Sequence, residues 1–108
     1  MYSIKIYTDR SGKSPYEEWF GSLTPIVMAR VEDRIDRLRL GNLGDTKSVG
    51  EGIHELRLQF GSGYRIYYGN IGKAVVLLLT GGDKSSQERN ITNAKKYFKD
   101  YKKQQKER

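Results

Sequence analysis

Two arginines near the middle of the 108-residue sequence form a candidate phosphate-binding pair. Arg57 and Arg65 lie on two alternating segments joined by Gly61-Ser62-Gly63, so a hairpin would bring both guanidinium groups within reach of one phosphate. Arginine suits this chemistry because its planar, permanently charged fork binds phosphate oxygens bidentately. Tyr67 and Glu55 are nearby, and the tyrosine ring could stack on a base. The alternative is that these side chains only decorate a solvent-facing sheet surface.

A further candidate for an anion contact is Lys84, which follows an apolar strand and precedes a helix N-terminus. The free backbone N–H groups of such a turn can hold an anion. The turn is not a nucleotide-binding P-loop, because that motif needs glycine where this chain has Leu78 and Asp83. The lone histidine, His54, shares a strand face with apolar residues, so we expect a hydrogen-bonded core histidine rather than a catalytic base.

The composition excludes several other kinds of site. The chain has no cysteine and one histidine, which excludes a disulfide scaffold, a cysteine-based zinc or redox site and a histidine metal site, so we expect no metal and no cofactor. No apolar run approaches the length of a membrane span, and the N-terminus lacks the apolar region of a signal peptide. We therefore expect a cytoplasmic protein without a membrane partner.

The formal net charge of +7 is concentrated in the C-terminal half. Residues 1–52 carry eight basic and eight acidic side chains, whereas residues 95–108 carry seven basic and two acidic ones. A polyanion is the natural partner of this end, although a lysine-rich terminus also serves solubility alone. In the N-terminal half, Arg30, Arg34 and Arg37 are interleaved with acidic residues, and we interpret them as a solvated, ion-paired helix face.

The helices and strands expected around these residues indicate an α+β fold in a single domain over residues 1–108. Apolar spacing and turn residues indicate one strand, two helices that begin after Ser14 and Thr24, an antiparallel three-stranded meander and a C-terminal helix. The predicted strands cover residues 2–7, 53–60, 64–68 and 73–80, and the unbroken apolar run AVVLLL in the last of them is typical of a central strand covered on both faces. We predict a mobile connection over 41–52, a frayed basic tail over 103–108, and a core of one thin apolar layer between the sheet and its helices.

Three motifs along the chain resemble a known family. They are His54-Glu55-Leu56-Arg57, then GYRIYY from Gly63, then LLLTGGDKSSQ from Leu77. At these separations they resemble the RelE/HigB superfamily of bacterial toxins, in particular its short "addiction module killer protein" branch. The similarity covers nearly the whole chain in order, including the early helix that contains Trp19.

The resemblance implies a microbial RNase-like, RelE-like fold and the toxin component of a type II toxin–antitoxin system. RelE and HigB themselves cleave messenger RNA in the ribosomal A site without a metal, as mRNA interferases. The implied partners are the ribosome, messenger RNA and a cognate antitoxin of the helix-turn-helix type. Arg57, Arg65 and Lys84 would be the catalytic residues, holding the phosphate and stabilising its extra negative charge. The residues implied to contact RNA are Tyr64, Tyr67, Lys95, Lys99, Lys102 and Lys103.

Two matters stay open at this point. Some relatives use a histidine or tyrosine near the C-terminal end for proton transfer, and neither Tyr97 nor Tyr101 matches that motif. The candidates for general acid and base are Lys84, Tyr64, Tyr67 and His54. Two other functions also fit the sequence: ParE-type toxins resemble this fold but inhibit DNA gyrase by protein contact, and a basic nucleic-acid-binding module would bind without cutting.

Overall fold

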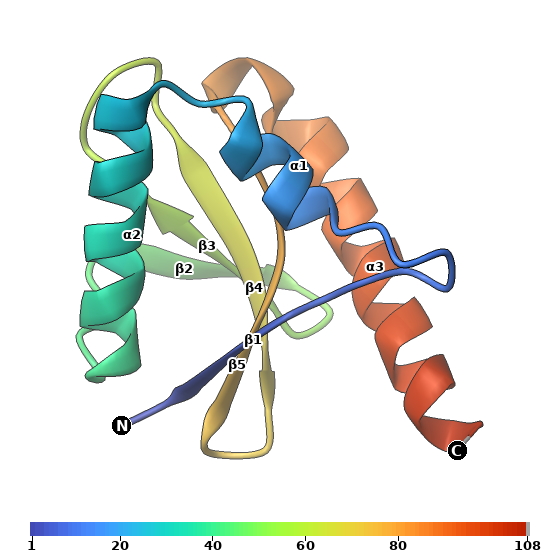
Figure 1. The fold of residues 1–108 in the computed structure, drawn as a ribbon. Coiled ribbons are helices and arrows are strands. Elements are labelled where there is room, and N and C mark those ends of the chain that lie inside the picture. Colours follow the sequence, from blue (N-terminus) through green and yellow to red (C-terminus); the bar gives the residue numbers. More distant parts are fainter. Residues whose placement is uncertain (108) are drawn as a thin grey trace.

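Five strands form one mixed sheet in the computed structural model, which describes residues 1–107 (Figure 1). The strands are β1 (Ser3–Ile6), β2 (Thr46–Gly50), β3 (Ile53–Arg57), β4 (Arg65–Ile71) and β5 (Val75–Gly82). Their order is β1-β5-β4-β3-β2, with β1 parallel to β5 and all other neighbours antiparallel. The predicted meander is confirmed as β3, β4 and β5, and the first strand joins it along β5.

Three α-helices and one short 3-10 helix complete the α+β domain. They are α1 (Pro15–Gly21), α2 (Pro25–Arg39), the 3-10 helix η1 (Lys84–Ser86) and α3 (Gln87–Lys106). Both predicted N-caps are confirmed. The Ser14 and Thr24 hydroxyls accept backbone N–H groups of the first turns of α1 and α2, at 3.1 and 3.4 Å. No helix within residues 1–107 is long and apolar enough to cross a membrane.

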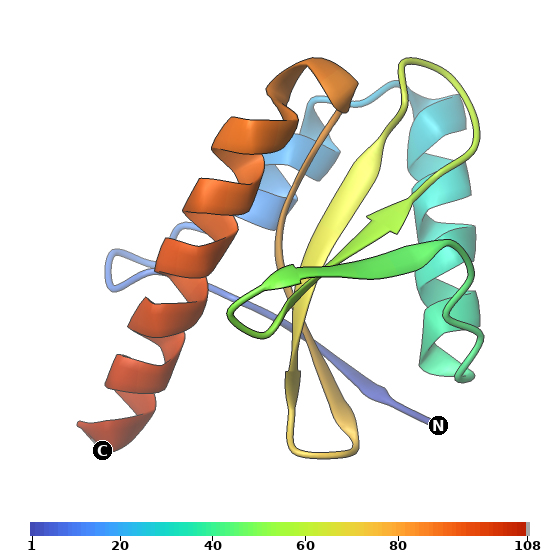
Figure 2. The ribbon, with the colours of Figure 1, turned by 180° about the vertical axis from the view of Figure 1, so that it is seen from behind.

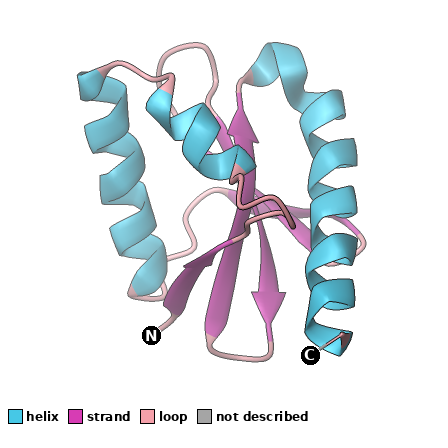
Figure 3. Cartoon of the chain, turned by 45° about the vertical axis from the view of Figure 1, so that its right-hand side comes forward, coloured by secondary structure: helices cyan, strands magenta, loops and turns pink. Residues whose placement is uncertain are grey.

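The helices cover both faces of the sheet. Figure 2 and Figure 3 show the sheet between α2 on one side and α3 on the other. In β5, Val76 and Leu78 face the side of α1 and α2, while Leu77 and Leu79 face α3, and all four are buried. The apolar run in β5 is therefore a central strand covered on both sides, as predicted. The prediction of a single apolar layer was wrong, because α3 builds a second core on the other face.

The glycine-rich stretch 41–52 is more ordered than predicted. Its second half forms β2, an edge strand that pairs with β3 and places Thr46 opposite Leu56. Lys47 and Ser48 in this strand are exposed, because an edge strand buries little of its surface. Residues 46–50 therefore do not alternate between apolar and polar side chains, and the sequence pattern does not reveal the strand.

Two element ends also differ from the predictions. β3 ends at Arg57 rather than at residue 60, and the chain then turns toward α2. α3 extends through Lys106, so the predicted frayed tail is helical over residues 103–106. The Arg10 guanidinium holds this end by donating to both carboxylate oxygens of Glu107, at 2.7 and 2.9 Å. The last residue of the predicted tail, Arg108, lies outside the described residues.

Candidate active site

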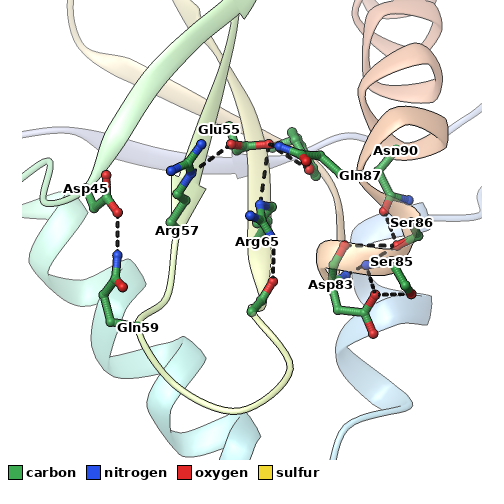
Figure 4. Close-up of polar contacts among 12 residues, drawn as sticks. Asp45, Glu55, Arg57, Gln59, Arg65, Asp83, Ser85, Ser86, Gln87 and Asn90 are labelled. Atoms are coloured by element: carbon green, nitrogen blue, oxygen red, sulfur yellow. Dashed lines mark hydrogen bonds and ion pairs between the residues drawn. The ribbon is translucent and has the colours of Figure 1, made fainter.

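The register of β3 and β4 brings the two candidate arginines together. Arg57 is paired with Arg65, and Glu55 with Tyr67, so the four side chains project from one face of the hairpin. Figure 4 shows both guanidinium groups beside Glu55, with Gln87 of α3 at the other side of the carboxylate. The predicted juxtaposition of the arginines is confirmed. Their face is not an open sheet surface, because Glu55 and Tyr67 are completely buried on it.

Glu55 is the centre of this polar cluster. Its Oε1 accepts the Arg57 Nε–H at 3.1 Å, and its Oε2 accepts the Tyr67 hydroxyl at 3.0 Å and the Gln87 amide at 2.9 Å. The Arg65 Nε lies 3.6 Å from the same Oε2. A buried carboxylate with these donors holds the arginine side chains in fixed positions, which is the preorganisation that a phosphate site requires.

The hydrogen bonds of the cluster also decide its protonation states. Burial alone would raise the pKa of Glu55, but hydrogen bonds from its neighbours, led by that of Gln87, outweigh burial and hold the pKa below its ordinary value. Burial and the adjacent carboxylate raise the pKa of Tyr67. At neutral pH Glu55 is therefore charged, and the Tyr67 hydroxyl remains protonated and donates to it.

Tyr67 cannot take the roles that the sequence analysis gave it. Its ring is completely buried and packs with Leu77 and Phe98 in the core beneath α3, so no RNA nucleobase can stack on it. Its hydroxyl is bonded to Glu55 and its pKa is raised, so it is a poor candidate for a general base. The prediction that Tyr67 contacts RNA was wrong because the segment was assigned an exposed face, whereas α3 covers that face.

Arg65 is buried, and it shares its counter-charge with Arg57. Its Nη1 donates to the Gly63 carbonyl at 2.7 Å, and its buried Nε is ion-paired with the Glu55 Oε2 at 3.6 Å, beyond hydrogen-bond distance. Arg57 beside it is 36% exposed. Two guanidinium groups thus face one carboxylate, and one positive charge is left for an anion.

Lys84 is brought to the same place by the turn after β5. Its backbone N–H donates to the Ser62 carbonyl at 3.4 Å, and its side chain is exposed. Gly63 lies between it and Arg65: a Cβ on Gly63 would meet the Arg65 Nη1 at 3.2 Å and the Lys84 Cβ at 3.3 Å. The φ of Gly63 is +78°, which also favours glycine. The three residues predicted to be catalytic therefore lie in one neighbourhood.

The turn between β5 and α3 is fixed by its own polar side chains (Figure 4). The Asp83 carboxylate accepts the backbone N–H and the hydroxyl of Ser85 at 2.9 and 2.6 Å. These hydrogen bonds hold the pKa of Asp83 below its ordinary value. The Ser86 hydroxyl donates to Asn90 on the next turn of α3. A turn held in this way places Gln87 against the carboxylate at the centre of the cluster.

Two other candidates lie away from the arginines. Tyr64 is half-buried and packs against Phe60 with a ring separation of 5.5 Å, in the core on the α2 side. His54 stacks on Tyr68 at 5.2 Å, and its Nε2 is hydrogen-bonded to Asn70 at 3.2 Å. His54 is therefore hydrogen-bonded as predicted, although half-buried, and neither side chain joins the candidate catalytic cluster.

The C-terminal lysines form a separate surface further along α3. Lys95 and Lys99 each contact Glu51 in the β2–β3 turn, at 3.4 and 3.2 Å. The Lys102 ammonium lies 4.1 Å from the centre of the Phe98 ring, and Lys103 is exposed. At 1.5 Å per residue, Lys95 is about 12 Å along the helix from Gln87. These lysines are too far from the arginines to touch the same phosphate.

Sequence reasoning missed how the site is organised. Glu55 was noted only as a neighbour of the arginines, and Gln87 only as a member of a motif. One signal was available: strand alternation places Glu55 on the face of Arg57, where a lone carboxylate between two arginines predicts an ion pair. Its burial was not predictable from the strand pattern, because it depends on where α3 packs.

The depressed pKa of Glu55 predicts how stability changes with pH. The unfolded chain takes up a proton near the ordinary pKa of 4.5, before the folded protein does. The contribution of Glu55 is thus complete above pH 4.5 and is lost as the pH falls through the lower pKa of the folded state. Urea unfolding at pH 7, 5, 4 and 3 should show the wild type losing its advantage over Glu55→Gln in this acid range. Parallel pH profiles would contradict the expectation.

Comparison with known proteins places the chain beside a relative without an assigned role. No protein-family model matches it. A protein of Haemophilus influenzae that is described only as uncharacterized is 46% identical over 81 residues, which is 74% of this chain and 82% of the relative. Within residues 1–107, no group of three or more histidine, aspartate or glutamate side chains is placed to hold a metal ion. The chemistry of the site therefore has to be argued from its cations.

Proposed function

Because the chain belongs to the same family as this uncharacterized Haemophilus influenzae protein, its activity has to be inferred from the site, and we propose that it is the toxin of a type II toxin–antitoxin pair. It acts in the cytoplasm as a metal-independent endoribonuclease that cleaves messenger RNA in the ribosomal A site. A cognate antitoxin of the helix-turn-helix type neutralises it. The RelE-like fold is part of the proposal, and it rests on the three sequence motifs.

One observation carries the proposal: Arg57 and Arg65 share the single charge of the buried Glu55, which leaves one positive charge uncompensated beside the exposed Lys84. A phosphodiester suits such an arginine pair, because its oxygens match the guanidinium fork. Glu55 keeps Arg57 and Arg65 in place before the substrate arrives. The arrangement supports electrostatic stabilisation of a phosphate whose negative charge increases during the reaction.

The reaction that needs this stabilisation is attack within the RNA chain. The 2′-hydroxyl oxygen forms a bond to the adjacent phosphorus, and the bond from phosphorus to the 5′ oxygen of the next nucleotide breaks. The products are a 2′,3′-cyclic phosphate and a 5′-hydroxyl. The five-coordinate phosphorus on this path carries extra negative charge, which Arg57 and Arg65 stabilise. A preorganised donor of this kind contributes about 10²- to 10³-fold to the rate.

Proton transfer falls to Lys84 or to the ribosome. Lys84 is an exposed ionisable group next to the arginines, and in this proposal its ammonium gives a proton to the departing 5′ oxygen. The proton of the attacking 2′-hydroxyl passes to water or to a group of the ribosome. Arginine itself is a poor proton donor at neutral pH. Activity on free RNA is accordingly slow, and the ribosome supplies much of the rate by holding the 2′-hydroxyl in line with phosphorus.

Two other functions make different predictions. A ParE-like poison of DNA gyrase causes DNA damage without new RNA ends. A non-catalytic basic module binds nucleic acid with strong salt dependence and cuts nothing. The cluster around Glu55 favours the nuclease over both, since a protein-contact poison or a simple basic surface needs no pair of arginines held in place by a buried carboxylate.

The proposal is tested by mapping RNA 5′ ends in cells minutes after the protein is induced without its antitoxin. We expect growth arrest together with new ends inside translated frames. A translation block that empties ribosomal A sites serves as the control and should remove these ends. Growth arrest without new ends would favour gyrase poisoning, and the absence of both would leave a binding protein; either outcome contradicts the nuclease proposal.

A further inference from the structure

A groove of about 500 Å³ lies between Arg57 and α2. One wall is a face of α2, and the other is formed by the end of β3, the residues that follow it and Asp45 before β2; Figure 4 shows Arg57, Gln59 and Asp45 there. Its basic side chains are Arg30, Arg34, Arg37 and Arg57. Arg57 belongs to both places: it bonds Glu55 in the candidate active site and lines the groove. The groove is thus continuous with the site.

The arginines of α2 are held in the groove by specific contacts. Both terminal nitrogens of Arg34 donate to the Asn42 carbonyl at 3.1 Å, and a Cβ on Gly44 would overlap its guanidinium. Burial, followed by the proximity of Arg37, lowers the pKa of Arg34. The Arg30 guanidinium lies 4.8 Å from the centre of the Phe60 ring. Arg30 and Arg34 are thus held by contacts other than the ion pairs predicted for this face, whereas Arg37 is ion-paired as predicted.

The charge of the groove is only partly balanced. Arg37 is paired with Asp33 at 3.1 Å, and Asp45 accepts a hydrogen bond from Gln59. Arg30 and Arg34 have no carboxylate partner among residues 1–107. The four arginines and two aspartates of the lining sum to +2, of which Arg57 is shared with the active site and is paired there with Glu55. The groove therefore attracts an anion along its length, beyond the single phosphate of the active site.

We propose that this groove holds the single-stranded RNA on one side of the scissile phosphate. The inference rests on the proposed function for the position of the cleaved bond, and it adds the path of the substrate. Single-stranded nucleic acid is typically bound by a cationic groove that follows the backbone together with an aromatic side chain that stacks on a base. Here α2 supplies the cations, and Phe60 with Arg30 supplies the stacking pair.

The continuity of the groove with Arg57 favours RNA over an acidic peptide. If one phosphate of an RNA chain is bound by Arg57 and Arg65, the nucleotides on either side of it must lie on the protein surface next to this pair. The groove adjoins Arg57, and the arginines of α2 along its wall can bind the phosphates of the following nucleotides. An acidic protein segment would have no reason to end at an arginine pair that is held in place by a buried carboxylate.

The test measures binding of a short single-stranded RNA whose 2′-hydroxyls are methylated, so that it cannot be cleaved. Arg30→Glu should weaken binding about tenfold and reduce the dependence of log affinity on log salt by about 0.7 for each lost phosphate contact. The matched control is Arg39→Glu, on the same helix. Arg39 is paired with Asp36 and lines a different hollow between α1 and α2, so its reversal should change affinity much less.

The outcomes test RNA binding in the groove independently of the proposed nuclease activity. Equal losses in Arg30→Glu and Arg39→Glu, or no loss in either, would overturn the proposal. It would also be overturned if an oligoglutamate peptide bound in an Arg30-dependent manner while the RNA did not, which would assign the groove to a protein partner. Arg30-dependent RNA binding by a protein that produces no new RNA ends in cells would refute the nuclease and leave the groove as an RNA site.

Discussion

Replacing Arg65 with alanine should reduce the rate of RNA cleavage about 10²- to 10³-fold, because it removes a preorganised donor for the charge that develops on the phosphate. Arg65 is the buried member of the pair, held between the Gly63 carbonyl and the Glu55 carboxylate. Its loss therefore acts on the transition state and leaves the distant RNA-binding surfaces unchanged. The measurement is the single-turnover rate on purified ribosomes programmed with a defined messenger RNA.

Two variants serve as controls for this result. Arg65→Lys keeps the positive charge and loses the planar fork, so it should recover only part of the activity. Arg89→Ala removes an exposed arginine from the first turns of α3 and should leave the rate close to that of the wild type. Circular dichroism and urea unfolding establish that each variant is folded. If Arg57→Ala and Arg65→Ala both remain as toxic as the parent, the assignment of the site is wrong.

Removing the Glu55 carboxylate should cost more stability than any other single change in the polar cluster. Glu55→Ala leaves the buried Arg65 without its counter-charge and deprives Tyr67 and Gln87 of their acceptor. Breaking a buried ion pair by removing one partner costs about 3–5 kcal/mol. We expect a decrease of this size in the free energy of unfolding, measured by urea denaturation at pH 7.

Glu55→Gln separates the charge of Glu55 from its shape. The amide retains one acceptor oxygen but no charge, so stability should fall by less than in the alanine variant, while cleavage falls because both arginines lose their anchor. Glu51→Ala is the matched surface control: Glu51 is exposed and pairs with Lys95 and Lys99, and its removal should change stability little. A Glu55→Ala protein as stable as Glu51→Ala would show that the carboxylate does not hold the cluster together.

Much of the fold was predictable because its signals are local. The N-caps at Ser14 and Thr24, each followed by proline, indicated where α1 and α2 begin. The unbroken apolar run in β5 indicated a central strand covered on both faces. The hairpin glycines and the alternation around them were enough to place Arg57 opposite Arg65. These features depend on neighbouring residues, which a sequence displays directly.

The rest depended on contacts between segments that are distant in the sequence. The edge strand β2 buries too little to produce an apolar alternation. The burial of Tyr67 and Glu55 follows from the position of α3, whose first residue, Gln87, lies 32 residues after Glu55. The arginines of α2 were correctly placed on one helix face, but only the fold shows that this face is a wall of a groove.

The most direct test of the central claim is the chemistry of the RNA ends that the purified protein produces on programmed ribosomes. If Arg57 and Arg65 stabilise the phosphate during attack by the 2′-hydroxyl, the products carry a 2′,3′-cyclic phosphate and a 5′-hydroxyl. A messenger RNA with a single 2′-deoxynucleotide at the cleavage position should then resist cutting there. Cleavage of the deoxy-substituted RNA at an unchanged rate, or products with a 5′-phosphate, would contradict the account.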